Sequence, residues 1–201
     1  MPTLLLATNN PGKLEEMRRL LAGLPVELVS PGEVGLNFEV LEDGQTYAEN
    51  AARKALAFNR ASGLATLADD SGLEVNALGG QPGLRSHRFA PWPDATDADR
   101  RAYLLQQLQG RARPWTANFH CSIAIVTRDG TVIYADGECP GEIIPDERGS
   151  NGFGYDPIFY IAQRQATMAE LEPEIKNQIS HRARAIQAAR PLLDRIFHPE
   201  S

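Results

Sequence analysis

The sequence has little cysteine, no excess of positive charge and no long apolar run, and each shortage excludes a class of protein. Its two cysteines, Cys121 and Cys139, are too few for a disulfide framework and too far apart for a zinc knuckle. We therefore expect a reducing compartment, the cytoplasm. The apolar run Leu4–Ala7 has no basic flank and is too short for a signal peptide or a membrane span, so we expect no membrane association.

Positive charge is the second shortage. Twenty Lys and Arg residues stand against 26 Asp and Glu residues, which gives a formal net charge of −6. Broad electrostatic capture of nucleic acid is therefore not expected. A phosphate ligand would need a local cluster of cations.

Hydrophobic residues make up 42% of the chain and charged residues 23%, as in an ordinary globular protein with a sizeable core. The length fits one large domain or two closely joined lobes, and no repeat or Ser/Gly linker marks a boundary. We therefore treat residues 1–201 as one domain with two lobes.

Hydrophobic periodicity predicts strands that alternate with helices. Thr46 and Glu49 have capping-box spacing at the start of a helix that ends at Gly63, and Asp129-Gly130 is typical of a hairpin turn. The predicted strands are 4–7, 26–29, 64–68, 116–127 and 131–135. The first predicted helix has Leu14, Met17 and Leu21 on one face and ends at Gly23. The other predicted helices cover 46–63, 96–108 and 178–197, the last with Pro191 as a kink or restart. This order indicates an α/β fold with a mixed sheet.

The first candidate site lies between the strand at residues 4–7 and the helix that follows. Backbone N–H groups, amide side chains and a cation can converge on phosphate at such a position. The residues are Thr8, Asn9, Asn10, Pro11, Gly12 and Lys13. A Walker A loop is excluded because it requires glycine at Ala7 and Ser or Thr at Leu14. The alternative is an ordinary strand-to-helix connection.

The second candidate is Asp69-Asp70-Ser71-Gly72, directly after a predicted apolar strand. Carboxylates at the end of a strand can hold Mg²⁺ through oxygen ligands. Neighbouring strand residues face opposite sides, so one aspartate would face the site while the other caps a turn or faces solvent. The alternative is a turn rich in Asp, Ser and Gly.

Two further segments complete the set of candidates. In the segment 149–157, glycines allow close approach to a ligand, and Phe153 and Tyr155 offer flat faces to a base, unless both rings pack into the core. Lys176 and the tripeptide 180–182 place several cations within about two helical turns. The tripeptide Ser-His-Arg also occurs at 86–88, where it is a decoy.

Taken together and in this order, these segments resemble the inosine triphosphate pyrophosphatase family, hydrolases that remove deaminated purine nucleoside triphosphates. The resemblance covers nearly the whole chain. It is carried by TNNPGK at 8–13, EDGQTYAENAARKA at 42–55, ADDSGLEVNALGGQPG at 68–83, GFGYDP at 152–157 and KNQISHR at 176–182. The family fold would be a long, twisted mixed sheet flanked by helices, in two lobes with a central cleft, and the usual assembly a homodimer.

The resemblance also implies roles for individual residues. Residues 8–13 would bind the triphosphate, Asp70 and Lys13 would be catalytic, and Asp70 with Glu42 would hold Mg²⁺. Ser71 would contact the substrate. The residues that would hold the nucleotide, chiefly its base, are Phe153, Gly154, Tyr155, Asp156, Lys176, His181 and Arg182.

The implied reaction cuts between the α and β phosphates and releases a monophosphate and pyrophosphate. Donors at the base site would favour ITP, dITP and XTP, because hypoxanthine and xanthine present a 6-oxo acceptor where adenine presents an amino donor. Three other readings remain at this point: a pyrimidine-preferring pyrophosphatase of the Maf type, a nucleotide-binding regulator that does not hydrolyse, and a nucleic-acid-binding module, which the acidic balance disfavours.

Overall fold

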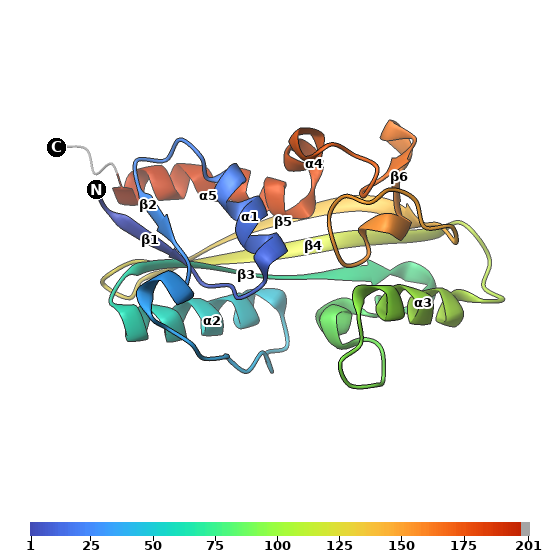
Figure 1. The fold of residues 1–201 in the computed structure, drawn as a ribbon, viewed down its shortest axis with the longest axis horizontal. Coiled ribbons are helices and arrows are strands. Elements are labelled where there is room, and N and C mark those ends of the chain that lie inside the picture. The colour runs from blue at the N-terminus through green and yellow to red at the C-terminus, as the bar shows by residue number, and fades with distance from the viewer. Residues whose placement is uncertain (198–201) are drawn as a thin grey trace. The chain divides into compact units, whose positions relative to one another are not determined.

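The structure is a computed structural model that describes residues 1–197 (Figure 1). Seven strands form one sheet in the order β2-β1-β3-β4-β5-β6-β7. The strands are β1 (Thr3–Leu6), β2 (Glu27–Val29), β3 (Ala65–Val75), β4 (Trp115–Val126), β5 (Val132–Ile143), β6 (Phe159–Ile161) and β7 (Ala166–Thr167). The helices are α1 (Pro11–Leu20), α2 (Tyr47–Ser62), α3 (Asp97–Leu108), α4 (Pro173–Ile179) and α5 (His181–Phe197).

The sheet is mixed, as predicted. β1 pairs in parallel with β2 and with β3, with Leu5 opposite Val29 on one side and Thr66 on the other. β6 pairs antiparallel with both β5 and β7. The parallel half follows from the alternation of strands and helices at the start of the chain, whereas β6 and β7 are too short to leave a periodic signal and were not predicted.

The chain forms two compact units, each described by itself. Unit 1 consists of residues 1–70, 121–137 and the chain from Arg182 onward. Unit 2 consists of residues 71–120 and 138–181. The strands β3, β4 and β5 each contribute residues to both units.

In unit 1, helices cover both faces of the strands. Figure 1 shows α1 and α5 on one face and α2 on the other. Met17 of α1 and Ile186 of α5 share one buried cluster with Leu67 of β3, while Ala55 and Phe58 of α2 belong to the buried cluster of the opposite face. Burial on both faces explains why β1 reads as a continuous apolar run rather than as an alternating pattern.

The ends of α2 follow the local sequence. The Thr46 side chain accepts a hydrogen bond from the backbone N–H of Glu49, and Gly63 ends the helix with a left-handed φ of 69°. Both boundaries are as predicted. The Glu49 carboxylate accepts from the N–H of Gln45 rather than from that of Thr46.

Unit 2 has a single buried cluster. Leu104 and Leu108 of α3 lie in it, together with Trp115, Tyr155 and Phe159 from the strands and the loop that follows them. The helix α3 begins at a complete capping box of Thr96 and Asp99 and ends at Leu108. Both ends were predicted.

The structure corrects several predicted boundaries. The strand predicted at 131–135 is β5, which continues to Ile143, because buried and exposed residues go on alternating through Cys139. β3 does not end at Ala68 but continues to Val75, because Leu73 and Val75 are fully buried and keep the strand pattern going. The predicted helix 178–197 is also wrong at its start. Its apolar stripe joins Ile179, which packs in unit 2, to Ile186, which packs in unit 1, and an extended Ser180 (φ −65°, ψ 156°) separates α4 from α5.

The expected restart at Pro191 is not observed, since α5 runs through this proline to Phe197. Among the described residues, no helix is both long and apolar enough to span a bilayer.

Candidate functional site

The phosphate-loop candidate is the turn between β1 and α1. Asn10 caps α1 with its side-chain oxygen, which accepts from the N–H of Lys13 at 3.1 Å, and Pro11 follows at the first helical position. The Thr8 hydroxyl accepts from the N–H of Asn10 at 3.2 Å. Thr8 and Asn10 therefore serve the turn itself, while Asn9 is exposed and its amide donates to the carbonyl of Phe38 at 3.5 Å. Because the turn is fixed in this way, the Lys13 side chain extends from a fixed position in the first turn of α1.

Lys13 forms an ion pair with Asp69. Its Nζ lies 3.0 Å from Oδ2 of Asp69, which is fully buried. Arg182, at the start of α5 and 2% exposed, donates from Nη2 to the same oxygen at 3.1 Å and pairs with Glu16 of α1 through Nη1. Side chains from α1, β3 and α5 thus form one ion cluster. The sequence analysis named Lys13 and Arg182 as site residues, but it did not predict that both would contact Asp69.

The two neighbouring aspartates of β3 have opposite electrostatic surroundings. Burial opposes ionisation of Asp69, but the charges of Lys13, Arg182 and Lys54 outweigh it and hold the pKa of this carboxyl well below its usual range. Burial raises the pKa of Asp70, and the charge of Glu42 adds to the rise. When environments push two carboxyl pKa values apart, the group with the raised pKa is the better candidate for moving a proton.

The expectation that one aspartate would cap a turn or face solvent is therefore wrong. Asp69 is 0% exposed and Asp70 is 8% exposed, and both lie inside a strand. The physical reason is that cations surround Asp69, so its burial needs no water.

Two residues of α2, Asn50 and Lys54, complete the ion cluster around Asp69 and Asp70. The sequence analysis assigned them no role. Asn50 donates to Oδ2 of Asp70 at 2.9 Å and accepts from the N–H of Gly44 at 2.8 Å. Lys54 donates to the backbone carbonyl of Asp69 at 3.0 Å and forms an ion pair with Glu42. These two side chains tie the 42–44 segment to the aspartates of β3. The sequence did contain a signal for Asn50 and Lys54: they are polar residues four positions apart, so they share one face of an alanine-rich helix.

The predicted metal ligands Glu42 and Asp70 suit a hard cation. Mg²⁺ is commonly bound by one or two carboxylates, with phosphate and water oxygens completing its shell. Burial raises the pKa of Asp70, and repulsion by the charge of Glu42 adds to the rise; a divalent cation held by both carboxylates would relieve that repulsion. Within residues 1–197, no group of three or more His, Cys, Asp or Glu side chains could form an all-protein metal site.

In unit 2 the base-site candidates gather around a buried ion pair. Lys176 of α4 places Nζ 2.7 Å from Oδ2 of Asp156, and the two residues are 6% and 4% exposed. The same carboxylate oxygen accepts from the N–H of Phe153 at 2.9 Å. The ammonium also lies 5.2 Å from the centre of the Phe153 ring. Phe153 as a whole is half-buried.

Tyr155 does not offer a free ring face. It is 5% exposed, packs in the core of unit 2 and donates from its hydroxyl to the carbonyl of Ser86 at 2.8 Å. The prediction of a flat face at this residue is therefore wrong, because the ring fills the core. Ser86 itself accepts from the N–H of Leu73, which gives the decoy tripeptide a structural role.

The remaining predicted residues of unit 2 are placed individually. His181 is 6% exposed, and its ring stacks on Phe119 at 4.7 Å between centres. Ser71 is half-buried in β3 directly after Asp70. Contact of each of these residues with a ligand remains a prediction.

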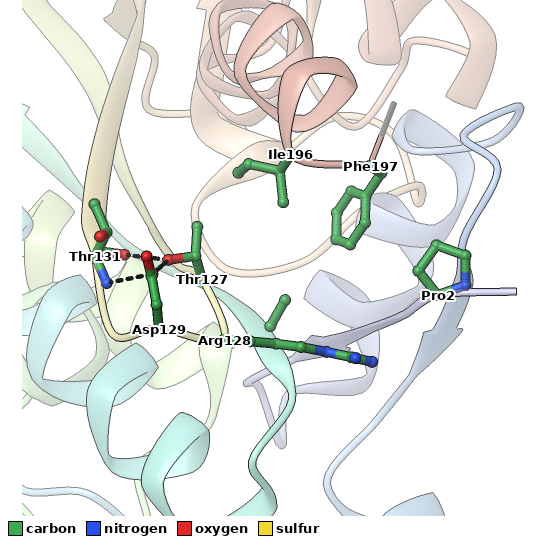
Figure 2. Close-up of a pocket in the computed structure, with 8 residues that line it drawn as sticks. Pro2, Thr127, Arg128, Asp129, Thr131, Ile196 and Phe197 are labelled. Atoms are coloured by element: carbon green, nitrogen blue, oxygen red, sulfur yellow. Dashed lines mark hydrogen bonds between the residues drawn. The ribbon is translucent and has the colours of Figure 1, made fainter. Parts of the chain in front are cut away.

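The pocket in Figure 2 is not part of either cluster. It has a volume of about 530 Å³ and lies in unit 1. Its lining residues are Pro2, Ala65, Thr127, Arg128, Asp129, Thr131, Ile196 and Phe197. The hydroxyl of Thr127 and the N–H of Thr131 both donate to the Asp129 carboxylate, so the polar side of this pocket is the hairpin turn satisfying its own hydrogen bonds. None of the predicted site residues is among those that line it.

Unit 1 carries a cluster of lysines and carboxylates on β3, and unit 2 carries a buried Lys-Asp pair beside the Phe153 ring. In a mixed α/β sheet, these residue types are the ones expected in the class of proteins that bind anionic, ring-bearing ligands. Comparison with known proteins identifies the family within that class. The Ham1 family model matches residues 4–192.

The similarity extends over whole chains. A dITP/XTP pyrophosphatase of Desulforamulus reducens is 47% identical over 195 residues, which cover 96% of each chain. The solved structure of a HAM1 protein from Coxiella burnetii matches with a TM-score of 0.87 at 40% identity and covers 96% of this chain and 98% of the other. The Staphylococcus aureus Ham1 protein matches with a TM-score of 0.84 at 37% identity, with the same coverage. The chain belongs to the Ham1 family.

Proposed function

We propose that this chain hydrolyses deaminated purine nucleoside triphosphates, namely dITP, XTP and ITP, to the monophosphate and pyrophosphate. The observation that carries the proposal is the ion pair of Lys13 with the buried Asp69, at 3.0 Å, next to Asp70. A lysine held this way is kept in place, as stabilisation of phosphate oxygens requires. Relatives named dITP/XTP pyrophosphatase support the substrate class.

Asp70 is the proposed catalytic carboxylate. Asn50 orients it through a 2.9 Å hydrogen bond, and burial raises its pKa. It would accept a proton from the attacking water or orient the metal. The residues proposed to hold Mg²⁺ are Asp70 and Glu42, and the bound ion would neutralise negative charge on the phosphate oxygens.

Residues 8–13 are proposed to bind the triphosphate. Arg182 supports that end of the substrate through its hydrogen bonds to Asp69, which also holds Lys13. In this arrangement its guanidinium donates to the carboxylates of Asp69 and Glu16.

For the base we propose stacking on Phe153 and hydrogen bonding near Asp156, Lys176 and His181. Stacking supplies affinity without discrimination, because every base has a π face. Discrimination would come from donors that pair with the 6-oxo group. A mismatch that leaves one buried polar group unpaired costs about 1 to 3 kcal/mol, equivalent to ~5-fold to ~150-fold in specificity. Rejection of guanine, which shares the 6-oxo group, would require a second mismatch at its 2-amino group.

The test is a substrate panel with defined products. Purified protein is incubated with ITP, dITP, XTP, GTP, ATP, dTTP and UTP, with and without Mg²⁺, and nucleotides and phosphates are separated by ion exchange. We expect monophosphate and pyrophosphate from the first three, and only with the metal. Release of diphosphate and orthophosphate would show cleavage at the wrong bond.

The same panel separates the alternatives. A preference for dTTP and UTP would identify a Maf-type enzyme, and binding without product would identify a regulator. The retained Asp70, Lys13 and their partners favour hydrolysis.

We also propose a homodimer that acts in the cytoplasm, where nucleotide pools need clearing, without a nucleic-acid or membrane partner. The assembly proposal rests on the family resemblance. Light scattering after size exclusion should give twice the mass of one chain.

A further inference from the structure

Gly154 lies in the middle of the 152–156 loop, and both of its backbone polar groups are held by side chains of α3. Oδ2 of Asp97 accepts from the N–H of Gly154 at 2.8 Å. Nη1 of Arg101 donates to its carbonyl at 2.9 Å. Asp97 and Arg101 are four residues apart, so they lie on one face of the helix. We call this arrangement the Gly154 clamp.

Both side chains of the clamp are themselves held. Arg101 forms a two-pronged pair with Glu147, with Nε and Nη2 at 2.8 and 2.9 Å from the two carboxylate oxygens, and its side chain is 12% exposed. Asp97 forms an ion pair with Arg100. A guanidinium fixed at two nitrogens keeps its third donor in one direction. The clamp is therefore organised before any ligand arrives.

The helix that carries the clamp is a rigid base. Leu104 and Leu108 are fully buried in the core of unit 2. The N-terminal turn of α3 is fixed by the capping box of Thr96 and Asp99. The backbone from which both clamp side chains extend is therefore fixed by a buried helix.

The clamp acts on the peptide planes next to Phe153. The N–H of Gly154 belongs to the peptide that joins it to Phe153, and its carbonyl belongs to the peptide that joins it to Tyr155. Gly154 has a φ of 62°, in the left-handed region that glycine adopts easily. Without the two hydrogen bonds of the clamp, its backbone would be free to rotate. Together with the hydrogen bond from the Phe153 N–H to Asp156, the clamp fixes the backbone on both sides of the Phe153 ring.

We infer that Asp97 and Arg101 are positioning residues for base binding: they touch no substrate and act by holding the Phe153 ring in place. The inference rests on the proposed function, in which Phe153 stacks on the base. Positioning by rigid supports raises affinity because less conformational freedom is lost on binding.

The experiment compares Arg101→Ala and Asp97→Ala with Arg111→Ala, which removes an exposed arginine in the turn after the same helix. Steady-state kinetics with dITP, XTP and Mg²⁺ are measured for each, with the melting temperature as the control for folding. Loss of a charge-assisted hydrogen bond should raise KM roughly 10-fold in both clamp variants. The kcat should stay within about 2-fold of the value for Arg111→Ala, since the groups that touch phosphate are unchanged.

Two further variants distinguish positioning from a merely structural role. Asp97→Asn keeps an oxygen acceptor for the Gly154 N–H and should restore most of the KM, although it removes the same charge as Asp97→Ala. In a Phe153→Ala background the Arg101→Ala effect on KM should disappear, because nothing remains for the clamp to position. If Arg101→Ala does not fold, the two Asp97 variants carry the test.

The outcomes separate the inference from the proposed function. If wild type and Arg111→Ala hydrolyse dITP but the clamp variants keep a normal KM, the positioning role is overturned and the function stands. Additive KM effects of Arg101→Ala and Phe153→Ala would also overturn it, because they would indicate independent contacts. If wild type hydrolyses none of the panel, both proposals fall.

Discussion

Asp69 and Asp70 are consecutive residues of β3 whose carboxylates meet different neighbours. Asp69 lies among Lys13, Lys54 and Arg182, whereas Asp70 accepts from Asn50 near Glu42. The same substitution at the two positions should therefore separate catalysis from stability.

Asp70→Asn should abolish turnover and leave the fold intact. The amide keeps the shape of the side chain but loses the charge for metal and proton, and we expect a loss in kcat of at least ~100-fold. Steady-state pyrophosphate release and urea unfolding test this prediction. Near-normal turnover would show that Asp70 is not the catalytic carboxylate.

Asp69→Asn should instead destabilise the protein. Removing the buried carboxylate takes away the partner of Lys13 and leaves Arg182 with Glu16 as its carboxylate partner, and breaking a buried pair in this way typically costs about 3 to 5 kcal/mol. The free energy of unfolding in urea is the measurement, and Asp70→Asn is the matched control. An unfolding free energy equal to that of the control would contradict the assigned role.

Gly152 is required by a close approach. A Cβ at this position would lie 2.1 Å from Oδ2 of Asp156 and 2.9 Å from Nζ of Lys176, at a φ of 78°. Gly152→Ala should therefore displace the ion pair and raise KM for purine triphosphates. Gly79→Ala is the control, since it imposes similar backbone strain (φ 63°) with open space around the new methyl group. Equal KM values for the two variants would refute the prediction.

At the level of elements, the segment between β2 and α2 is tied to α1 by one carboxylate. Glu33 accepts from the hydroxyl and N–H of Ser30 at 2.7 and 2.6 Å and from Arg18 at 2.6 Å. These contacts, the Ser30 hydrogen bonds above all, lower the pKa of Glu33 from 4.5 to about 2. Because the folded pKa is depressed, the stabilisation is complete above pH 4.5 and is lost as the pH falls towards 2.

Glu33→Gln should therefore lower the melting temperature at pH 7, and the difference from wild type should shrink as the pH falls from 5 to 2.5. Ser30→Ala, which removes one donor, should show part of the same effect. Differential scanning fluorimetry across this range provides the comparison. A difference that stayed constant with pH would rule out Glu33 as its source.

The elements that sequence reasoning predicted well are those with local signals. The capping residues Thr46 and Thr96 marked two helix starts, and Asp129-Gly130 marked the hairpin. The break at Ser180 was missed, because Ile179 and Ile186 form one helical stripe in the sequence although they pack in different cores. Such a break arises from tertiary packing, so the hydrophobic periodicity of the sequence cannot predict it.

In the candidate site too, local motifs predicted some residues, whereas the roles of others depend on tertiary contacts. Lys13 and Asp70 could be proposed from their motifs, but the roles of Asn50, Lys54 and Asp69 depend on contacts between residues 15 to 56 positions apart. The family resemblance supplied the association of the motifs. Their electrostatics required the structure.

At the scale of the whole molecule, both cysteines are protected. Cys121 is 0% exposed and Cys139 is 2% exposed, and burial raises the pKa of the Cys121 thiol. Cys121 belongs to the buried apolar cluster of unit 1, as a core residue does. A disulfide reagent such as DTNB should leave the native protein unmodified and titrate two thiols after denaturation. Rapid labelling of the native protein would show that one of the two sites opens.

Unit 1 is assembled from three stretches of chain, and the whole of unit 2 is encoded between its first stretch and its last. Arg182, which neutralises Asp69, stands 113 residues after it. During synthesis the aspartate therefore leaves the ribosome long before one of its principal counter-charges exists. A chain that stops before α5 therefore lacks the arginine that pairs with this buried carboxylate, and we expect unit 1 to remain unstable until that helix has been made.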